Sequence, residues 1–464
     1  MEHTPTIRST IETELKQRGY TFSSFSKISG INRGTFSTML NSNPPKPISV
    51  RQMDLITKAL GYPEGWLYGL YIDECFYEGK GHWKRIKPFL LRCVDLGRKD
   101  CIQKVLSRLT EDLSYVSTVF EFAEELHEGG KENESAPFYE CVIENERYYH
   151  SERLAISQYR LFRVQIGTNA EENLKLTILF SPFLDRLPVA YQLDALLQMA
   201  NIYSSLHKWS QTIFCSQRLL ELTKRIYEYR VAQDNINHED LEPYCSERSL
   251  VVYYGQALLM QAFSLQKQEF YQEAKKIVSR YADLSWFKGL DEVGQREVEK
   301  LKMYATANGY VLDLLMGDKR NLEKYVLLLE ENEKEILPGI LTLLEVANKQ
   351  SFNIDNILKR FSGYIQKFSE NEDALYMDDY CNFTLQLALY QFNFNDYTAG
   401  IDTILKNIKL ALSVNDPSVF AQSIILFEKY KNFATKCQYN ELTTHKEEFG
   451  KDFNFAFQAN DQGI

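Results

Sequence analysis

The chain of 464 residues has few of the residues that interrupt helices, with only 22 glycines and 12 prolines. This composition excludes collagen-like proteins and intrinsically disordered chains. No window approaches the roughly 18 consecutive apolar residues of a membrane span, and the N-terminal segment lacks the apolar core of a secretory signal. The eight cysteines are scattered without a C-x-x-C pair, so we expect reduced, mostly buried thiols in a cytoplasmic protein.

Catalytic and metal-binding motifs are also missing from the sequence. None of the seven histidines lies in H-E-x-x-H or beside cysteines at zinc spacing. Phosphate-binding glycine loops and the G-x-S-x-G nucleophile motif do not occur. The polar cluster at 237–240 and the glutamate-rich run at 330–335 are interpreted as a solvated loop and an exposed helix end. We therefore predict no enzyme activity, no metal and no cofactor.

Charge is distributed unevenly along the chain. The whole sequence carries 53 basic and 63 acidic side chains, a formal charge of −10. Residues 1–70 contain eight basic and five acidic side chains, a balance of +3, and the remainder carries −13. A small basic head on a large acidic body is typical of a nucleic-acid reader joined to another functional part.

The head, residues 1–70, is predicted to contain four or five short helices. Gly19 is expected to end the first, Ser23 or Ser24 to cap the second, Asn32 to cap the third, and Ser49 to begin the fourth. Residues 43–47 are predicted to form a loop. The apolar residues that we expect to form the head's core are Ile7, Ile11, Leu15, Phe25, Ile28, Phe36, Met39, Leu40, Met53, Ile56, Leu60, Trp66, Leu67 and Leu70.

The second and third of these helices, joined at Ser29-Gly30, have the pattern of a helix-turn-helix. Residues 5–70 resemble the repressor-type (Xre/Cro) family, with turn glycine Gly30, apolar Ile31 and Phe36, and Ser26 where alanine is usual. The resemblance implies that Arg33, Gly34, Thr35 and Thr38 face base edges, with Ser37 also on the exposed side. The positions that it places near phosphates are Ser23, Ser24, Lys27, Asn32 and Asn41.

Beyond the linker-like stretch at 77–87, the body has the pattern of paired helices without strand-type alternation. Three segments, 195–222, 257–284 and 385–412, share an alanine in the first helix, an aromatic near the turn, and a second helix. The theme resembles the tetratricopeptide repeat, whose pairs stack into a right-handed superhelix with a concave face. The predicted fold class is therefore all-α, with a head at 1–70, a linker and first helices at 71–104, and repeats at 105–464.

The first helix of each pair would line the concave face, where amides and aromatic rings suit an extended peptide. The residues predicted to bind it are Asp194, Asn201, Gln256, Phe263, Asn382 and Phe392. The whole architecture resembles the peptide-pheromone receptors of Gram-positive bacteria, including arbitrium-type receptors. That resemblance implies a homodimer, paired through its C-terminal repeats, that binds an operator in double-stranded DNA and a short signalling peptide. The alternatives are a regulator whose body binds a protein partner, and a scaffold whose head is vestigial.

Overall fold

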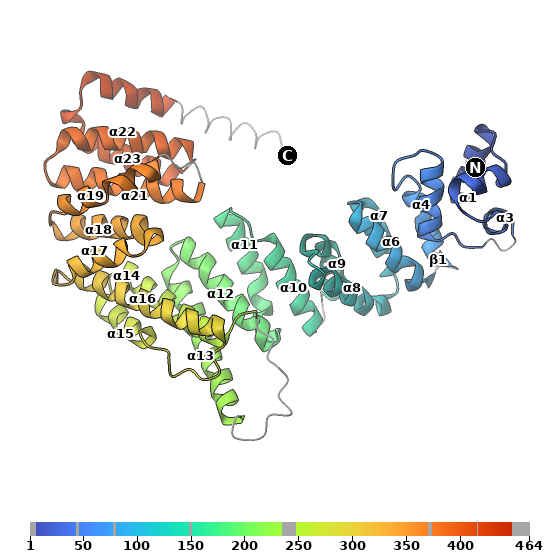
Figure 1. The fold of residues 1–464 in the computed structure, drawn as a ribbon, viewed down its shortest axis with the longest axis horizontal. Coiled ribbons are helices and arrows are strands. Elements are labelled where there is room, and N and C mark those ends of the chain that lie inside the picture. Colours follow the sequence, from blue (N-terminus) through green and yellow to red (C-terminus); the bar gives the residue numbers. More distant parts are fainter. Residues whose placement is uncertain are drawn as a thin grey trace. The chain divides into compact units, whose positions relative to one another are not determined.

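The computed structural model describes residues 6–42, 46–77, 80–147, 151–233, 247–369, 374–414 and 416–447. The all-α prediction is confirmed, since helices form nearly all of these ranges (Figure 1). They also contain one antiparallel pair of short strands, β1 (Phe76–Tyr77) and β2 (Lys80–Gly81). The chain divides into two compact units, Met1–Leu206 and His207–Ile464. No helix within the described ranges is long and apolar enough to cross a membrane.

The N-terminal unit begins with short helices whose buried faces follow the predicted stripes. Ile7, Ile11 and Leu15 are buried on the first helix, and Phe36, Met39 and Leu40 on the third. Asn32 and Ser49 cap the third and fourth helices as predicted. These elements are α1 (Ile7–Gln17), α2 (Phe22–Ser29), α3 (Arg33–Asn41), α4 (Val50–Ala59), α5 (Tyr68–Tyr71) and the 3-10 turn η1 (Ile72–Cys75).

Two details of α2 differ from the prediction. Its N-cap is Thr21, which forms a reciprocal capping box with Ser24, so the cap lies earlier than expected. Ile28 is 53% exposed and does not join the core; it lies in the last turn of α2, which ends at Ser29. Of the predicted loop at 43–47, residues 43–45 lie outside the described part of the chain.

Within the stretch at 77–87, predicted to be linker-like, Ile86 is buried and belongs to the hydrophobic core of this unit. The stretch contains β2 and the first turn of α6 (Trp83–Asp95), and the buried rings of Tyr68 and Tyr71 lie 5.2 and 5.0 Å from that of Phe89 on α6. One hydrophobic core runs from Ile7 to Val142. The later elements of this unit are α7 (Lys99–Leu109), η2 (Leu113–Tyr115), α8 (Val116–Glu128), α9 (Glu132–Asn145), α10 (Glu152–Gln165), α11 (Ala170–Phe180), η3 (Ser181–Arg186) and α12 (Val189–Ser205).

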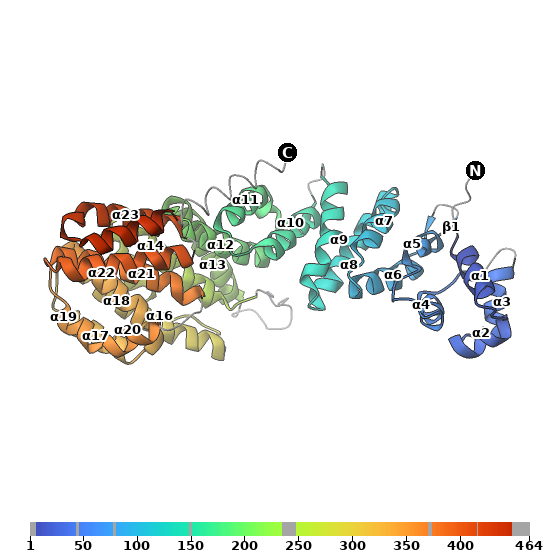
Figure 2. The ribbon, with the colours of Figure 1, turned by 90° about the horizontal axis from the view of Figure 1, so that it is seen from above.

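In the C-terminal unit successive helices pack against one another, as Figure 2 shows for α21 and α22. Its elements are α13 (Trp209–Gln233), α14 (Leu250–Lys267), α15 (Tyr271–Tyr281), α16 (Glu292–Leu315), α17 (Leu322–Glu330), η4 (Glu333–Glu335), α18 (Ile336–Gln350), α19 (Asp355–Arg360), α20 (Ser362–Ser369), α21 (Ala374–Asn393), α22 (Tyr397–Ser413), α23 (Pro417–Tyr430), η5 (Lys431–Phe433) and a helix at 436–447.

Small residues stand where helices of this unit approach closely. Ala262, Ala274 and Ala388 are buried. At Gly400 on α22, an added Cβ would lie 2.5 Å from Cε1 of Phe392 on α21. The absence of a side chain there leaves room for the phenyl ring, so glycine is needed for this crossing.

The cysteines of the described ranges form no disulfides. Six are buried free thiols, namely Cys75, Cys93, Cys101, Cys141, Cys215 and Cys381, and Cys437 is exposed. Cys245 lies outside the described residues. Burial in apolar surroundings raises the pKa of the Cys215 thiol to about 11, which keeps it protonated and unreactive near neutral pH.

Candidate functional site

The turn between α2 and α3 is fixed by side-chain hydrogen bonds at both ends. Gly30 ends α2 with φ +69° and ψ 8°, a left-handed conformation that glycine adopts without a steric cost. Ser26 Oγ donates to the carbonyl oxygen of Ile31 at 2.6 Å, and Asn32 Oδ1 accepts from the backbone N–H of Gly34 at 2.8 Å. The Ser26 hydroxyl therefore fastens the turn.

The opposite face of α3 is accessible because Phe36, Met39 and Leu40 bury its other side. The exposed members of the predicted DNA-binding set are Ser23, Lys27, Asn32, Arg33, Gly34, Thr38 and Asn41, and the half-buried ones are Ser24, Thr35 and Ser37. The Ser24 hydroxyl donates to and accepts from the backbone of Thr21 at 2.9 Å, and the side chains of Asn32 and Thr38 also bond to the backbone of α3. The predicted phosphate contact of Ser24 would compete with its bonds to Thr21.

Ion pairing leaves positive charge on the α2–α3 face. Three acidic side chains of the head pair elsewhere: Glu14 with Arg18, and Asp54 and Glu64 with Arg92, a residue of α6. Lys27 and Arg33 form no ion pair within the described ranges and are exposed. Two uncompensated cations beside a helix N-terminus favour a polyanion at this surface.

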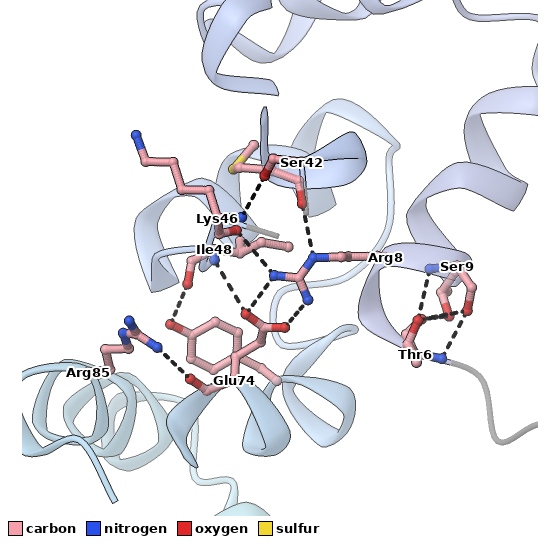
Figure 3. A network of polar contacts seen from close by, with 11 residues as sticks. Thr6, Arg8, Ser9, Ser42, Lys46, Ile48, Glu74 and Arg85 are labelled. Carbon is pink, nitrogen blue, oxygen red and sulfur yellow. Dashed lines mark hydrogen bonds and ion pairs between the residues drawn. The ribbon is translucent and has the colours of Figure 1, made fainter. Parts of the chain in front are cut away.

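The C-terminal end of α3 is held by a polar network centred on Arg8 and Glu74 (Figure 3). Arg8 Nε donates to the carbonyl oxygen of Met39 at 2.9 Å, and its Nη2 donates to that of Lys46 at 3.1 Å. Both Nη atoms also bond to the Glu74 carboxylate, with 3.0 Å between Nη2 and Oε2. The guanidinium thus links α1, the end of α3 and η1.

The same network continues toward the body. The backbone N–H of Ile48 donates to Glu74 Oε2 at 3.5 Å, and Tyr71 Oη donates to the carbonyl oxygen of Ile48 at 2.8 Å. Arg85 on α6 donates to the Glu74 carbonyl oxygen at 3.3 Å (Figure 3). The end of α3 is therefore linked to α6 indirectly, through Arg8 and then Glu74.

Two of the predicted peptide-binding residues do not line an open face, which corrects that prediction. Asp194 is buried on α12, where its carboxylate pairs with Arg163 and accepts from Tyr159 Oη at 2.9 Å. Phe392 is buried against Gly400 and stacks on Tyr430, with 4.1 Å between ring centroids. Each faces a neighbouring helix, because helices inside a stack are covered on more than one side.

Two further members of the set lie on exposed helix positions. Asn201 is exposed on α12 of the N-terminal unit, and Asn382 is exposed on α21 of the C-terminal unit. Both amides are therefore at the surface, as a ligand contact requires.

The remaining two predicted residues lie on α14 of the C-terminal unit. Phe263 is 39% exposed and lines a pocket of about 340 Å³, and Gln256 Nε2 donates to Glu297 Oε1 at 3.5 Å. The other side chains of this pocket, which we call the α14–α16 pocket, are Leu259, Ala262, Gln266, Val278, Tyr304, Asn308 and Glu335. Its volume lies at the lower end of the roughly 300–1,000 Å³ of ligand sites.

Sequence reasoning missed four residues of the α14–α16 pocket, namely Val278, Tyr304, Asn308 and Glu335. Tyr304 and Asn308 lie one turn apart on α16, and their spacing alone marks them as sharing a face. Glu335, in the run interpreted as an exposed helix end, does lie at the start of α18 but also borders the pocket. No local signal places it beside Phe263, more than 70 residues earlier.

Clusters of metal-ligating side chains are absent from the described ranges. The polar cluster at 237–240 falls outside the described residues. Comparison with known proteins finds no matching family model and no matching curated protein.

Proposed function

We propose that this protein is a peptide-responsive transcriptional regulator that binds operator DNA through α2 and α3. The observation that carries the proposal is the exposed polar face of α3, with Arg33 unpaired within the described ranges, beside a turn fixed by Ser26 and Asn32. Such a face suits a helix that enters the major groove, because an arginine there can bond bidentately to guanine. Thr35 and Thr38 supply smaller polar groups beside it.

The body supports a ligand-binding role in the same proposal. Stacked helices with small residues at their crossings are typical of tetratricopeptide-like superhelices, which bind extended segments along one face. The α14–α16 pocket combines aromatic Phe263 and Tyr304 with the amides of Gln266 and Asn308. Aromatic walls hold apolar side chains, and carboxamides both donate to and accept from a peptide backbone. Together with the resemblance to pheromone receptors, this favours a short cytoplasmic signalling peptide, bound by a homodimer.

The test is a gel-shift titration of the full chain on DNA from upstream of its own and neighbouring genes. We expect Arg33→Ala to weaken specific binding by about 1–3 kcal/mol, the value of one bidentate base contact. The control is Arg147→Ala, which removes an exposed arginine from the same unit but lies after α9. Equal affinities of Arg33→Ala and the unaltered protein would remove the base-reading role of α3.

The titration is then repeated with synthetic peptides encoded by small open reading frames adjacent to the gene. A change in DNA affinity with one peptide would support ligand control, because a ligand shifts DNA affinity only by its differential binding to two states.

A protein partner is the second candidate for the body. Ile178 and Leu179 are adjacent on α11 and are 57% and 68% exposed, and exposed apolar groups are typical of protein contacts. DNA binding that ignores every peptide would favour this candidate.

A further inference from the structure

We propose that the α14–α16 pocket selects a positively charged group of the bound peptide, either its α-ammonium or a lysine or arginine side chain. The inference rests on the proposed peptide-binding function and specifies what one part of the site recognises. It starts from Glu335, the carboxylate that borders the pocket where η4 meets α18.

Glu335 differs from the neighbouring carboxylates in having no cationic partner. Glu297 lies 3.9 Å from Lys300, and Glu345 lies 3.3 Å from Lys267. Glu335 is half-buried and forms no ion pair within the described ranges. A partly desolvated carboxylate without a counter-charge gains most from a cation that a ligand brings.

The charge of Glu335 already affects the pocket wall. Burial is the main cause that raises the pKa of the Tyr304 phenol, and the nearby negative charges of Glu335 and Glu297 raise it further. Tyr304 therefore remains a neutral hydrogen-bond donor near neutral pH. The phenol therefore adds no negative charge beside the Glu335 carboxylate.

The aromatic walls favour the same kind of guest. The ammonium of Lys267 lies 5.6 Å from the ring centroid of Phe263, and that of Lys300 lies 5.6 Å from the ring of Tyr304. Both rings thus already attract a cation on one side, as ring quadrupoles do. A cation inside the pocket would meet the two rings and a carboxylate.

Amide groups complete the set of acceptors. Asn308 Nδ2 donates to Tyr281 Oη at 2.9 Å, which fixes the amide and leaves Oδ1 as its acceptor. Gln266, on the α14 side, offers a second carboxamide. An ammonium or guanidinium has several N–H donors and no acceptor, so this combination of carboxylate and amide oxygens matches it.

The experiment measures binding of fluorescently labelled synthetic hexapeptides to the full chain by fluorescence polarisation. A positional-scanning set places arginine, its neutral isostere citrulline, or glutamate at each position in turn. Each peptide is made with a free and with an acetylated N-terminus, which separates an α-ammonium from a side chain. The variants are Glu335→Gln and, as the matched control, Glu333→Gln, an exposed glutamate of the same 3-10 turn that does not border the pocket.

We expect a cation at one position, or the free N-terminus, to tighten binding by about tenfold, and glutamate to weaken it. Glu335→Gln should remove this preference and leave binding of the neutral peptide unchanged, while Glu333→Gln keeps both. A far-ultraviolet circular dichroism spectrum equal to that of the unaltered protein shows that Glu335→Gln is folded.

Peptides that bind without a preference for charge, or a preference that survives Glu335→Gln, would overturn this inference and leave the proposed function standing. Failure of every peptide in the set to bind would overturn both.

Discussion

The Arg8–Glu74 network at the end of α3 predicts that Glu74→Gln lowers the local stability of the head, although this substitution creates no cavity. Glu74 has an 11% exposed side chain and accepts from Arg8 and from the backbone of Ile48. Glu74→Gln keeps the shape but replaces a charged acceptor by a neutral one and brings N–H groups toward the guanidinium. Hydrogen bonds to charged groups contribute about 1.5–3 kcal/mol, so we expect the free energy of local opening of the head to fall by that amount.

The assay is hydrogen–deuterium exchange of the full chain, read on peptides that cover α1 and α3. A loss of about 1.5–3 kcal/mol in the free energy of local opening corresponds to exchange faster by roughly 12- to 140-fold. The control is Asp73→Asn in the same 3-10 turn, which breaks the ion pair of an 86% exposed carboxylate with Arg108. Exposed pairs contribute about 0–1 kcal/mol, so exchange should change little.

A companion variant tests whether Arg8 and Glu74 act as a unit. Arg8→Met alone leaves the Glu74 carboxylate without its guanidinium, a costly state for a nearly buried charge. In the Arg8→Met background, Glu74→Gln should then lower the free energy of local opening by less than it does in the unaltered protein. Strictly additive effects, or exchange in Glu74→Gln no faster than in Asp73→Asn, would refute the claim that this network holds α3.

Three further outcomes follow from other contacts. Ser26→Ala removes the hydrogen bond to Ile31 and should lower the free energy of unfolding by about 0.5–1 kcal/mol, measured as a lower urea midpoint. Gly400→Ala should lower the free energy of unfolding by about 1–3 kcal/mol, because the added methyl group crowds Phe392. In a Phe392→Leu background this loss should vanish, since the crowding is relieved and alanine favours the helix more than glycine does. Burial lowers the pKa of His127, so the folded chain binds fewer protons than the unfolded chain as the pH falls. The free energy of unfolding should therefore decrease from about pH 7.5 to 5.5, and it should decrease less steeply in His127→Gln.

The head was predictable because its signals are local. A cap such as Asn32 and a core stripe such as Phe36, Met39 and Leu40 are set by neighbours within one or two turns. The cap of α2 was misplaced only because Thr21 and Ser24 form one reciprocal capping box. Both have hydroxyl side chains, so the sequence alone does not show which of them is the N-cap.

The exposed sides of the body helices were harder to predict, because packed helices contact neighbours on more than one side. On α12 and α21, the spacing that selected Asp194 and Phe392 fits a side covered by other helices equally well. On α14 the same spacing selected Phe263, which borders a pocket; its contact with a peptide stays a prediction. Glu335 could not be found, since its position beside Phe263 depends on the path of the three intervening helices α15, α16 and α17.

Packing between the head and the first body helices limits how a ligand could act on DNA binding. If residues 77–87 were a slack tether, a bound peptide could release the head without disturbing its core. Instead Tyr68 and Tyr71 pack on Phe89, and Glu74 joins α3 to Arg85 on α6. Freeing the head would break one continuous core, at a cost beyond the differential affinity of about 1–3 kcal/mol typical of allosteric ligands. Under the proposed function, the head and α6 therefore move together as one rigid unit. Control of DNA binding must then come from the position of this unit relative to the head of the second subunit of the homodimer.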